Sequence, residues 1–280
     1  MASKATAPAL LVTSGISQYL GAAIGIGLFS VVPAAGVAWW RLAIGAVALS
    51  LLWRPWREEW TLRSFGVAVL FGLFLGGMNV TFYEAVARIP LGVAVSLEFT
   101  GPVVVALFGS GTKGRIAAVL ALLGVVAIGG LGVDLGAPGV LAGIVFAFAA
   151  AAFWAGYIVF GQKVASSGHG VTSLAVGCAA AALFFAPFLA QSAFRLEFSW
   201  VLVFQLVGVA VLSTVIPYSV EVFALKRLSA AMFALLTALL PATSAVVGFL
   251  ALSQNVSLGT AIGLILISLA VALASTSTRS

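Results

Sequence analysis

Three glutamates are the side chains of this 280-residue chain that are best placed to do chemistry. Glu84, Glu98 and Glu221 each fall inside a long apolar run, while the other acidic residues lie in short polar segments. A charged side chain inside a bilayer costs roughly 2.5 to 3.5 kcal/mol on insertion scales, so it usually has a function or a partner. Each glutamate is therefore a candidate for solute binding or proton transfer unless a neighbouring residue explains it.

Glu98 is the glutamate that local pairing explains least. It lies eight residues after Pro90, where its apolar run begins, which is about 12 Å along a helix that rises 1.5 Å per residue. The nearest basic residue, Arg88, lies outside that run. Two interpretations stay open: Glu98 faces a central pathway, or it is protonated and bonded to Ser, Thr or backbone at a helix interface.

Local partners are available to the other two glutamates. Glu84 precedes Arg88 by four residues, the spacing at which opposite charges pair on a helix surface. Glu221 precedes Lys226 by five residues and Arg227 by six, so we expect it to pair with one of them near the membrane surface. Contact with a substrate is the alternative for both glutamates.

Polar and aromatic side chains also recur at helical spacing inside the apolar runs. Asn79 and Tyr83 are one turn apart, and Trp154 precedes Tyr157 by three residues. Trp and Tyr usually mark the membrane–water interfaces, yet several of these residues lie well inside their runs. We therefore expect the substrate-binding residues to be Gln18, Asn79, Tyr83, Glu98, Trp154, Tyr157 and Tyr218.

Arg41 lies within an apolar run, directly after Trp39 and Trp40. These two tryptophans sit near the end of the run and fit an interfacial belt. Arg41 either snorkels outward to that interface or faces the interior, where a carboxylate ligand would pair with it.

Prolines interrupt the apolar runs close to the candidate binding residues. Pro102 stands four residues after Glu98, and Pro241 stands four residues after Thr237. Because proline has no N–H, the carbonyls near positions 98 and 237 are expected to lose their helical partners, which is tolerated where a helix lines a cavity. Together with Pro217, these prolines are the candidate kink and gating positions.

Composition indicates a membrane protein. The chain is 63% hydrophobic and only 7% charged, with a mean hydropathy of +1.24, whereas a soluble domain is about one quarter charged. The net charge of +6 is spread over short loops, so no nucleic-acid partner is expected. The expected partner of this surface is the lipid bilayer. One cysteine and one histidine leave no basis for a metal site, a cofactor or an enzyme with clustered catalytic groups.

Ten apolar runs are long enough to span ~30 Å of hydrocarbon as helices. The sequence therefore predicts an all-α polytopic membrane protein. The expected spans cover about 8–28, 37–53, 64–86, 90–109, 116–131, 140–160, 171–189, 200–224, 230–252 and 258–274. A cleavable signal peptide is the rival interpretation of the first span, but a single preceding Lys4 and polar residues within the run favour a retained helix.

The second half of the chain repeats the first at an offset of 139 residues. Arg88 aligns with Arg227 and Pro102 with Pro241 in one ungapped register, together with Ala85 and Ala224, Gly109 and Gly248, and Gly124 and Gly263. Because five spans per copy invert the second copy in the bilayer, this pattern is typical of secondary transporters with a central site. We expect two inverted five-helix repeats, 8–131 and 140–275, joined by a linker at 132–139 and enclosing a central cavity.

The distribution of Lys and Arg orients the chain. With a cytoplasmic N-terminus, ten basic residues lie on the inner side and only Arg88 and Arg195 lie on the outer side. The positive-inside rule then places both termini in the cytoplasm. A multi-pass protein of the bacterial inner membrane is expected.

The ten spans and the turns at Arg88 and Arg227 resemble the drug/metabolite transporter superfamily of the EamA type. The stretch PLGVAVSLEFTGPV, from Pro90 to Val103, is similar to the aromatic amino-acid and threonine/homoserine exporters. This resemblance implies a basket of ten helices, with spans one to four and six to nine around the cavity. The second repeat departs from the first at Thr237, so a role for charge would be asymmetric.

A secondary transporter that exports aromatic and other neutral amino acids by alternating access is the preferred interpretation. Glu98 would bind the substrate ammonium group, and Trp154 and Tyr157 would stack on an apolar side chain. The alternative is proton-coupled efflux of lipophilic cations or other small metabolites. Proton-coupled antiport and facilitated diffusion both fit these residues.

Overall fold

The computed structural model describes residues 6–109, 111–129, 136–194, 199–237, 239–253 and nine positions between 258 and 273. Within these residues the chain is helical and has no strands. Its elements are α1 (Thr6–Gly27), α2 (Ala34–Trp53), η1 (Pro55–Arg57), α3 (Leu62–Val86), α4 (Leu91–Glu98), α5 (Thr100–Gly109), α6 (Thr112–Gly129), α7 (Val140–Ser166), α8 (Gly170–Phe194), α9 (Trp200–Ala210), η2 (Val211–Val215), α10 (Ile216–Leu225), α11 (Ala230–Leu236) and α12 (Leu239–Leu252).

Eight helical segments of the described chain are long and apolar enough to cross a membrane. They are α1, α2, α3, α4 with α5, α7, α8, α9 with η2 and α10, and α11 with α12. The fifth expected span forms the helix α6 but is not among these eight. The tenth expected span, 258–274, is described only at nine of its positions, so the number of ten spans stays a prediction.

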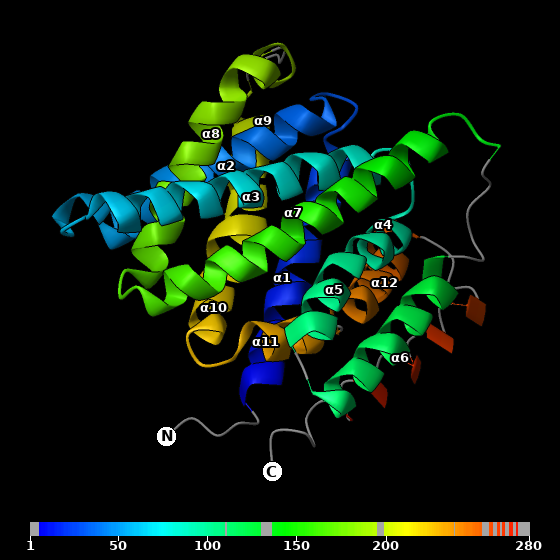
Figure 1. Ribbon diagram of the computed structural model, residues 1–280. Coiled ribbons are helices and arrows are strands. Elements are labelled where there is room, and N and C mark those ends of the chain that lie inside the picture. The colour runs from blue at the N-terminus through cyan, green and yellow to red at the C-terminus, as the bar shows by residue number, and fades with distance from the viewer. Residues whose placement is uncertain are drawn as a thin grey trace.

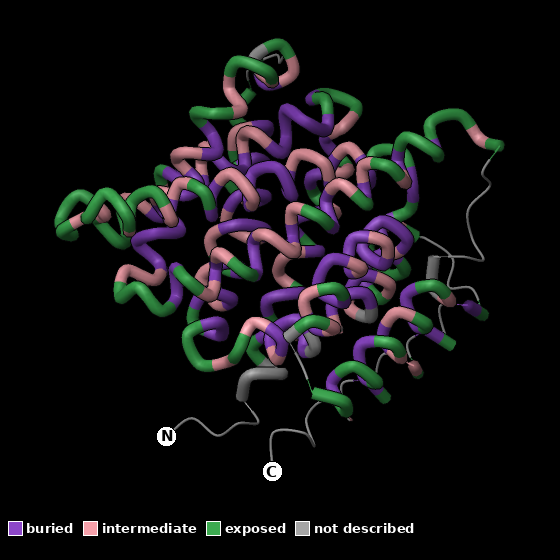
Figure 2. Tube along the Cα trace, viewed as in Figure 1, coloured by how far each residue is buried: buried purple, intermediate pink, exposed green. Residues whose placement is uncertain are grey.

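The outer surface of the helices is apolar. Large hydrophobic side chains such as Phe108, Phe188 and Phe204 are mostly exposed, and Figure 2 shows exposed positions along the outward turns and buried positions where helices cross. Such a surface is unfavourable in water but matches hydrocarbon. Several polar side chains are instead buried between the helices, including Arg41 and Glu98.

Helix pairs from the two halves of the chain pack side by side. In Figure 1, α3 runs along α7 and α2 lies against α8, while α1 packs on α12 and on the α9–η2–α10 segment. The short helices α4 and α5 both contact α7, and they pack on α12 and α11 respectively. Every one of these contacts brings a segment of residues 6–109 against a segment after residue 140.

Small residues allow the closest of these contacts. A Cβ on Gly72 of α3 would overlap the backbone of Gly177 in α8, and one on Gly101 of α5 would overlap the carbonyl of Ala151 in α7. Without a side chain, the two backbones approach within van der Waals distance, as in many membrane helix pairs. Gly72 is therefore a packing residue of the α3–α8 interface.

Both spans that contain the repeated prolines are interrupted. The helix α4 ends at Glu98 and α5 begins at Thr100, and α11 ends at Leu236 before α12 begins at Leu239. Pro102 and Pro241 follow these interruptions at the expected spacing. The Thr237 carbonyl, expected to lack a helical partner, accepts the Leu240 N–H at 2.9 Å. This tighter turn gives the Thr237 carbonyl a hydrogen-bond donor, so the expectation of a carbonyl without a helical partner is wrong at the second proline.

A π-helical turn precedes Pro217. In η2 the N–H of Ile216 bonds the carbonyl of Val211, five residues earlier rather than four. Pro217 has no N–H to offer the Ser213 carbonyl, which is four residues before it. The segment therefore presents the carbonyls of Leu212 and Ser213 to neighbouring helices, and single π-turns of this kind are frequent at functional sites.

Candidate binding site

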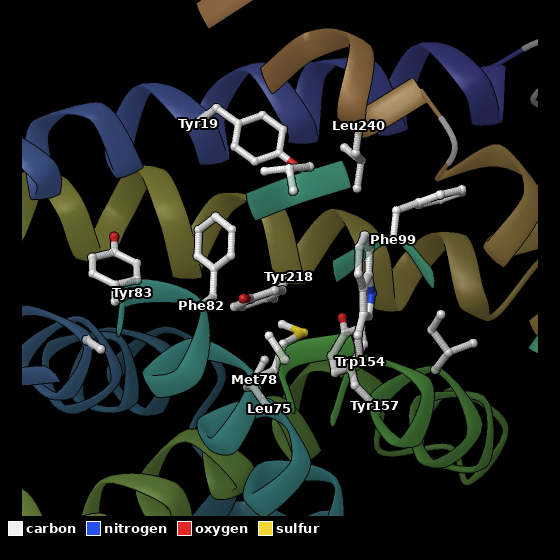
Figure 3. Close-up of a cluster of buried hydrophobic side chains, with 14 of the residues drawn as sticks. Tyr19, Leu75, Met78, Phe82, Tyr83, Phe99, Trp154, Tyr157, Tyr218 and Leu240 are labelled. Atoms are coloured by element: carbon white, nitrogen blue, oxygen red, sulfur yellow. The ribbon is translucent and has the colours of Figure 1, made fainter. Parts of the chain in front are cut away.

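A buried polar cluster lies where α3 and α10 meet. The Tyr218 hydroxyl donates a hydrogen bond to Asn79 Oδ1 at 3.1 Å, and Asn79 Nδ2 donates to the Leu75 carbonyl at 2.7 Å. Both side chains are almost completely buried. Figure 3 shows Tyr218 among aromatic rings from other helices, including Phe82, Trp154 and Tyr157. Asn79 and Tyr218, which the sequence analysis expects to bind substrate, are thus brought together, although α3 and α10 are far apart in the chain.

Arg41 of α2 reaches into this cluster and does not snorkel outward. Its Nε donates to Thr214 Oγ1 at 3.1 Å, and one Nη donates to the Ser213 carbonyl and, at 3.4 Å, to the Tyr218 hydroxyl. The guanidinium carbon lies 5.1 Å from the Tyr83 ring centre and 5.9 Å from the Tyr218 ring centre. Only 1% of Arg41 is exposed, so the cation is held by neutral oxygens and aromatic rings.

Glu221 faces the interior and does not pair with Lys226 or Arg227, which corrects the sequence expectation. Its two carboxylate oxygens accept the Tyr157 hydroxyl at 2.9 Å and the Ser14 hydroxyl at 3.3 Å. Lys226 and Arg227 are both exposed at the turn after α10. Glu221 therefore joins α10 to α1 and α7, because the helix turns its carboxylate towards the core.

Glu84 has a structural explanation at the end of α3. It forms an ion pair with Arg88, as the i,i+4 spacing predicted. It also accepts the Ala35 N–H at 3.1 Å, at the start of α2, where Pro33 offers no side-chain cap. A carboxylate at a helix N-terminus is favourable both as a hydrogen-bond acceptor and as a charge near the helix dipole.

Glu98 is the glutamate without a partner. It is the last residue of α4 and is 6% exposed. Among the residues that the structure describes, its carboxylate has no hydrogen bond and no ion pair. The next residue, Phe99, packs its ring edge-to-face against Trp154 with 6.1 Å between centroids. The described contacts therefore do not include the bond to Ser, Thr or backbone that was one of the two interpretations of Glu98.

The remaining candidate residues lie around the same interior. Tyr157 stacks on Phe71 at 5.1 Å and lies 5.8 Å from the Tyr218 ring, while Tyr83 contacts Arg41. Gln18 projects from α1, and its side-chain oxygen is buried with no hydrogen-bond partner within the described chain. The seven residues expected to bind substrate thus come from α1, α3, α4, α7 and α10.

Sequence reasoning left one prominent interior residue undecided and missed another. For Arg41, the sequence did not decide between the membrane interface and the interior. The Ser213 carbonyl that binds Arg41 is available because of the π-turn, which the sequence did not predict. Tyr19 of α1 is fully buried and points into the aromatic cluster in Figure 3. Its position in an otherwise aliphatic stretch, next to Gln18, was the available signal. In the described part of the chain, no three His, Cys, Asp or Glu residues gather as metal ligands.

Apolar spans around a buried interior with charged, amide and aromatic side chains define a multi-pass membrane protein. The chain belongs to the EamA-like transporter family, whose model matches residues 141–276, and the predicted family is confirmed. The threonine/homoserine exporter RhtA of Salmonella typhimurium strain LT2 is 40% identical over 238 residues, which cover 85% of this chain and 80% of that protein. The exporter of the same name from Escherichia coli K12 is 39% identical over the same length.

A solved structure supports the fold independently of these relatives. It is a crystal structure that aligns with 99% of this chain and 99% of its own, with a TM-score of 0.73 at 21% identity. Identity this low establishes a shared fold and no shared substrate. Family and fold together make the chain a multi-pass transporter of the bacterial inner membrane.

Proposed function

We propose that this protein exports neutral amino acids across the inner membrane by alternating access. Small hydroxyl-bearing substrates come first, because relatives at 39–40% identity over 85% of the chain are named threonine/homoserine exporters. Aromatic amino acids are included in the proposal because Phe99, Trp154 and Tyr157 lie in one buried cluster in Figure 3, where Phe99 packs on Trp154 and directly follows Glu98 in the chain. Aromatic faces can stack on such side chains.

The observation that carries this proposal is the unpaired carboxylate of Glu98. A buried charge without a partner is costly, because it loses hydration and gains no counter-charge. The ammonium group of an amino acid would supply that counter-charge as well as hydrogen bonds. Glu98 also ends a helix, so its backbone carbonyl region is free to adjust as the solute binds.

Alternating access is supported by the burial of the site. Asn79, Tyr157, Tyr218 and Glu98 are each at most 6% exposed, so a solute enters only when the helices move. The interruptions after Glu98 and Leu236 divide two spans into halves that can tilt separately. We assign the gating motion to these interruptions, with Pro102, Pro241 and the π-turn before Pro217 as its hinges.

The packing of the helices supports the inverted repeats 8–131 and 140–275, with their linker at 132–139. At the offset of 139, α7 is the counterpart of α1, and the α9–η2–α10 segment is the counterpart of α3. The contact of α3 with α7 in one copy therefore corresponds to the contact of α9–η2–α10 with α1 in the other, and the structure contains both contacts. The contacts α4–α12 and α5–α11 correspond to each other in the same way. Such correspondence is expected of two copies related by an axis in the membrane plane, around a central cavity.

Contacts between loops support the proposed orientation with both termini in the cytoplasm. Trp60, in the basic loop before α3, stacks on His169 in the α7–α8 turn with 4.5 Å between rings. Arg63 and Lys163 line one surface pocket of about 310 Å³ at this end. Basic residues expected on the inner side are therefore gathered at one end of the bundle.

Counterflow in proteoliposomes tests the proposed function. Purified protein is reconstituted with an internal amino acid, and uptake of labelled L-threonine, L-homoserine, L-phenylalanine and glycine is measured. We expect exchange of neutral amino acids by the unmodified protein and reduced exchange by Glu98→Gln and Trp154→Ala. Glu58→Gln, an exposed loop glutamate, is the matched control and should exchange normally. Absence of exchange for every amino acid would overturn the proposal.

Efflux of lipophilic cations is the second candidate, because an unpaired carboxylate beside aromatic rings also suits a bulky cation. The buried Arg41 opposes it by repelling cations from the same interior. The counterflow experiment therefore includes labelled tetraphenylphosphonium, with and without a pH gradient. Saturable uptake of this cation that depends on the gradient would favour the second candidate.

A further inference from the structure

Arg41 is a buried cation that has no anionic partner among the residues that the structure describes. Within the described residues, Arg88 and Glu84 form the only ion pair, so neither Glu98 nor Glu221 neutralises Arg41. Neutral oxygens of Thr214, Ser213 and Tyr218 are its hydrogen-bond acceptors. A guanidinium removed from water needs an anion for full compensation, since neutral acceptors replace only part of its hydration. Arg41 is therefore incompletely satisfied in the closed interior.

The acceptor that holds Arg41 exists because the helix is broken. In a regular α-helix the Ser213 carbonyl would accept the N–H of residue 217, but that residue is Pro217. The π-turn frees the Leu212 carbonyl in the same way, and Ser17 of α1 donates to it at 2.8 Å. Two consecutive carbonyls of one transmembrane segment are thus satisfied by side chains of α1 and α2 rather than by their own helix.

We propose that Arg41 binds the carboxylate of the transported amino acid, and that the Ser213 carbonyl occupies the guanidinium until that carboxylate replaces it. This inference rests on the proposed function. An arginine presents five donors in a planar fork that matches both oxygens of a carboxylate. The three present contacts of Arg41 are one-oxygen contacts, which a bidentate, charge-assisted pair exceeds in strength.

Arg41 and Glu98 together match a zwitterion. Both side chains are buried between the helices, and among the described residues no ion pair joins them. The carboxylate of an α-amino acid would supply the anionic partner that Arg41 lacks, and its ammonium group would supply the cationic partner that Glu98 lacks. Tyr83 and Tyr218 flank the guanidinium with their rings and limit its movement. The site therefore selects substrates that carry a free carboxylate, and it disfavours amines and amino-acid amides.

Competition between L-threonine and L-threoninamide tests this selection, because the amide keeps the ammonium group and lacks the carboxylate. Each competes for counterflow of labelled L-threonine in proteoliposomes. We expect the amide to inhibit about thirtyfold more weakly in the unmodified protein, the effect of losing one buried charge pair. In Arg41→Gln the two inhibitors should approach equal strength, with Arg41→Lys between. Arg88→Lys, at an arginine outside the interior, should keep the full preference.

Pro217→Ala gives a second test that leaves Arg41 in place. Alanine restores the N–H that the Ser213 carbonyl lacks, so the guanidinium loses its competing acceptor. We expect a lower KM for L-threonine and no change in inhibition by L-threoninamide. Should Arg41→Gln fail to fold, this variant decides the question.

The outcomes separate the two proposals. No amino-acid exchange by the unmodified protein overturns the proposed function. Amino-acid exchange in which L-threoninamide competes as well as L-threonine overturns only the role of Arg41. The same conclusion follows if the preference persists in folded Arg41→Gln, or if the KM of Pro217→Ala is unchanged.

Discussion

The Tyr218 hydroxyl donates to Asn79 Oδ1 across a sequence separation of 139 residues, the offset that aligns Arg88 with Arg227. Asn79 and Tyr218 are thus equivalent positions of the proposed repeat. Equivalent atoms of two related copies can touch only at the axis that relates them. In the proposed repeat this axis would pass between these two side chains, at the centre of the cluster that also contains Arg41. Different residues at the two positions make the centre asymmetric, as a site for an asymmetric solute requires.

Tyr218→Phe is expected to destabilise the protein by leaving Asn79 Oδ1 buried without a donor. A lost buried partner of this kind costs about 1 to 3 kcal/mol in the free energy of unfolding. Adding Asn79→Leu should recover part of that loss, because Asn79 Nδ2 bonds only the Leu75 carbonyl of its own helix. Thermal unfolding in detergent measures Tyr218→Phe, Asn79→Leu and the double variant. Additive losses in the double variant would contradict the coupling.

Glu221 is expected to stabilise the contact of α10 with α1 and α7. Glu221→Ala leaves the Tyr157 hydroxyl without its acceptor, while the Ser14 hydroxyl keeps the Pro217 carbonyl at 3.3 Å. We therefore expect the melting temperature to fall, with roughly 1 to 3 kcal/mol lost. Glu221→Gln keeps one acceptor oxygen and should lose less. Lys226→Gln should have no effect, because Lys226 is exposed and does not pair with Glu221. Equal losses of stability in Lys226→Gln and Glu221→Ala would instead support the local ion pair that the sequence predicted.

The sequence predicted features that depend on neighbours along one helix. The pairing of Glu84 with Arg88 needs only the i,i+4 spacing. The resemblance to the exporter family was indicated by the Pro90–Val103 stretch together with the pattern of spans. The partners of Glu221 were predicted wrongly, because its rotation towards α1 and α7 is fixed by tertiary packing. Arg41 remained undecided for the same reason. Its inward direction depends on a carbonyl of a π-turn in another helix, and no periodicity in α2 indicates that turn.

Gly72→Ala is expected to separate α3 from α8 and to lower the melting temperature. The new methyl group would overlap the backbone of Gly177, which cannot rotate away as a side chain can. Overpacking of this kind costs typically about 1 to 3 kcal/mol. Gly66→Ala is the matched control on the same helix, where an added Cβ meets no atom within 4 Å. Because alanine favours helix by about 1 kcal/mol over glycine, this control should be neutral or stabilising. A similar fall in both variants would show that the α3–α8 contact is not responsible, because helix propensity favours alanine at both positions.

Inverted repeats predict that equivalent turns open on opposite sides of the membrane. Ala87 and Lys226 are 139 residues apart, at the exposed turns after α3 and α10. Cys178 is buried and is the single cysteine of the chain, so Cys178→Ala provides a background without reactive thiols.

In that background we expect a membrane-impermeant maleimide added to intact spheroplasts to label Ala87→Cys and not Lys226→Cys. Glu58→Cys, in the basic loop before α3, should behave as Lys226→Cys does. After permeabilisation all three should react, because the three positions are exposed. Labelling of Ala87→Cys and Lys226→Cys from the same side would mean that the two copies run in the same direction, and a central site between inverted halves would then be untenable.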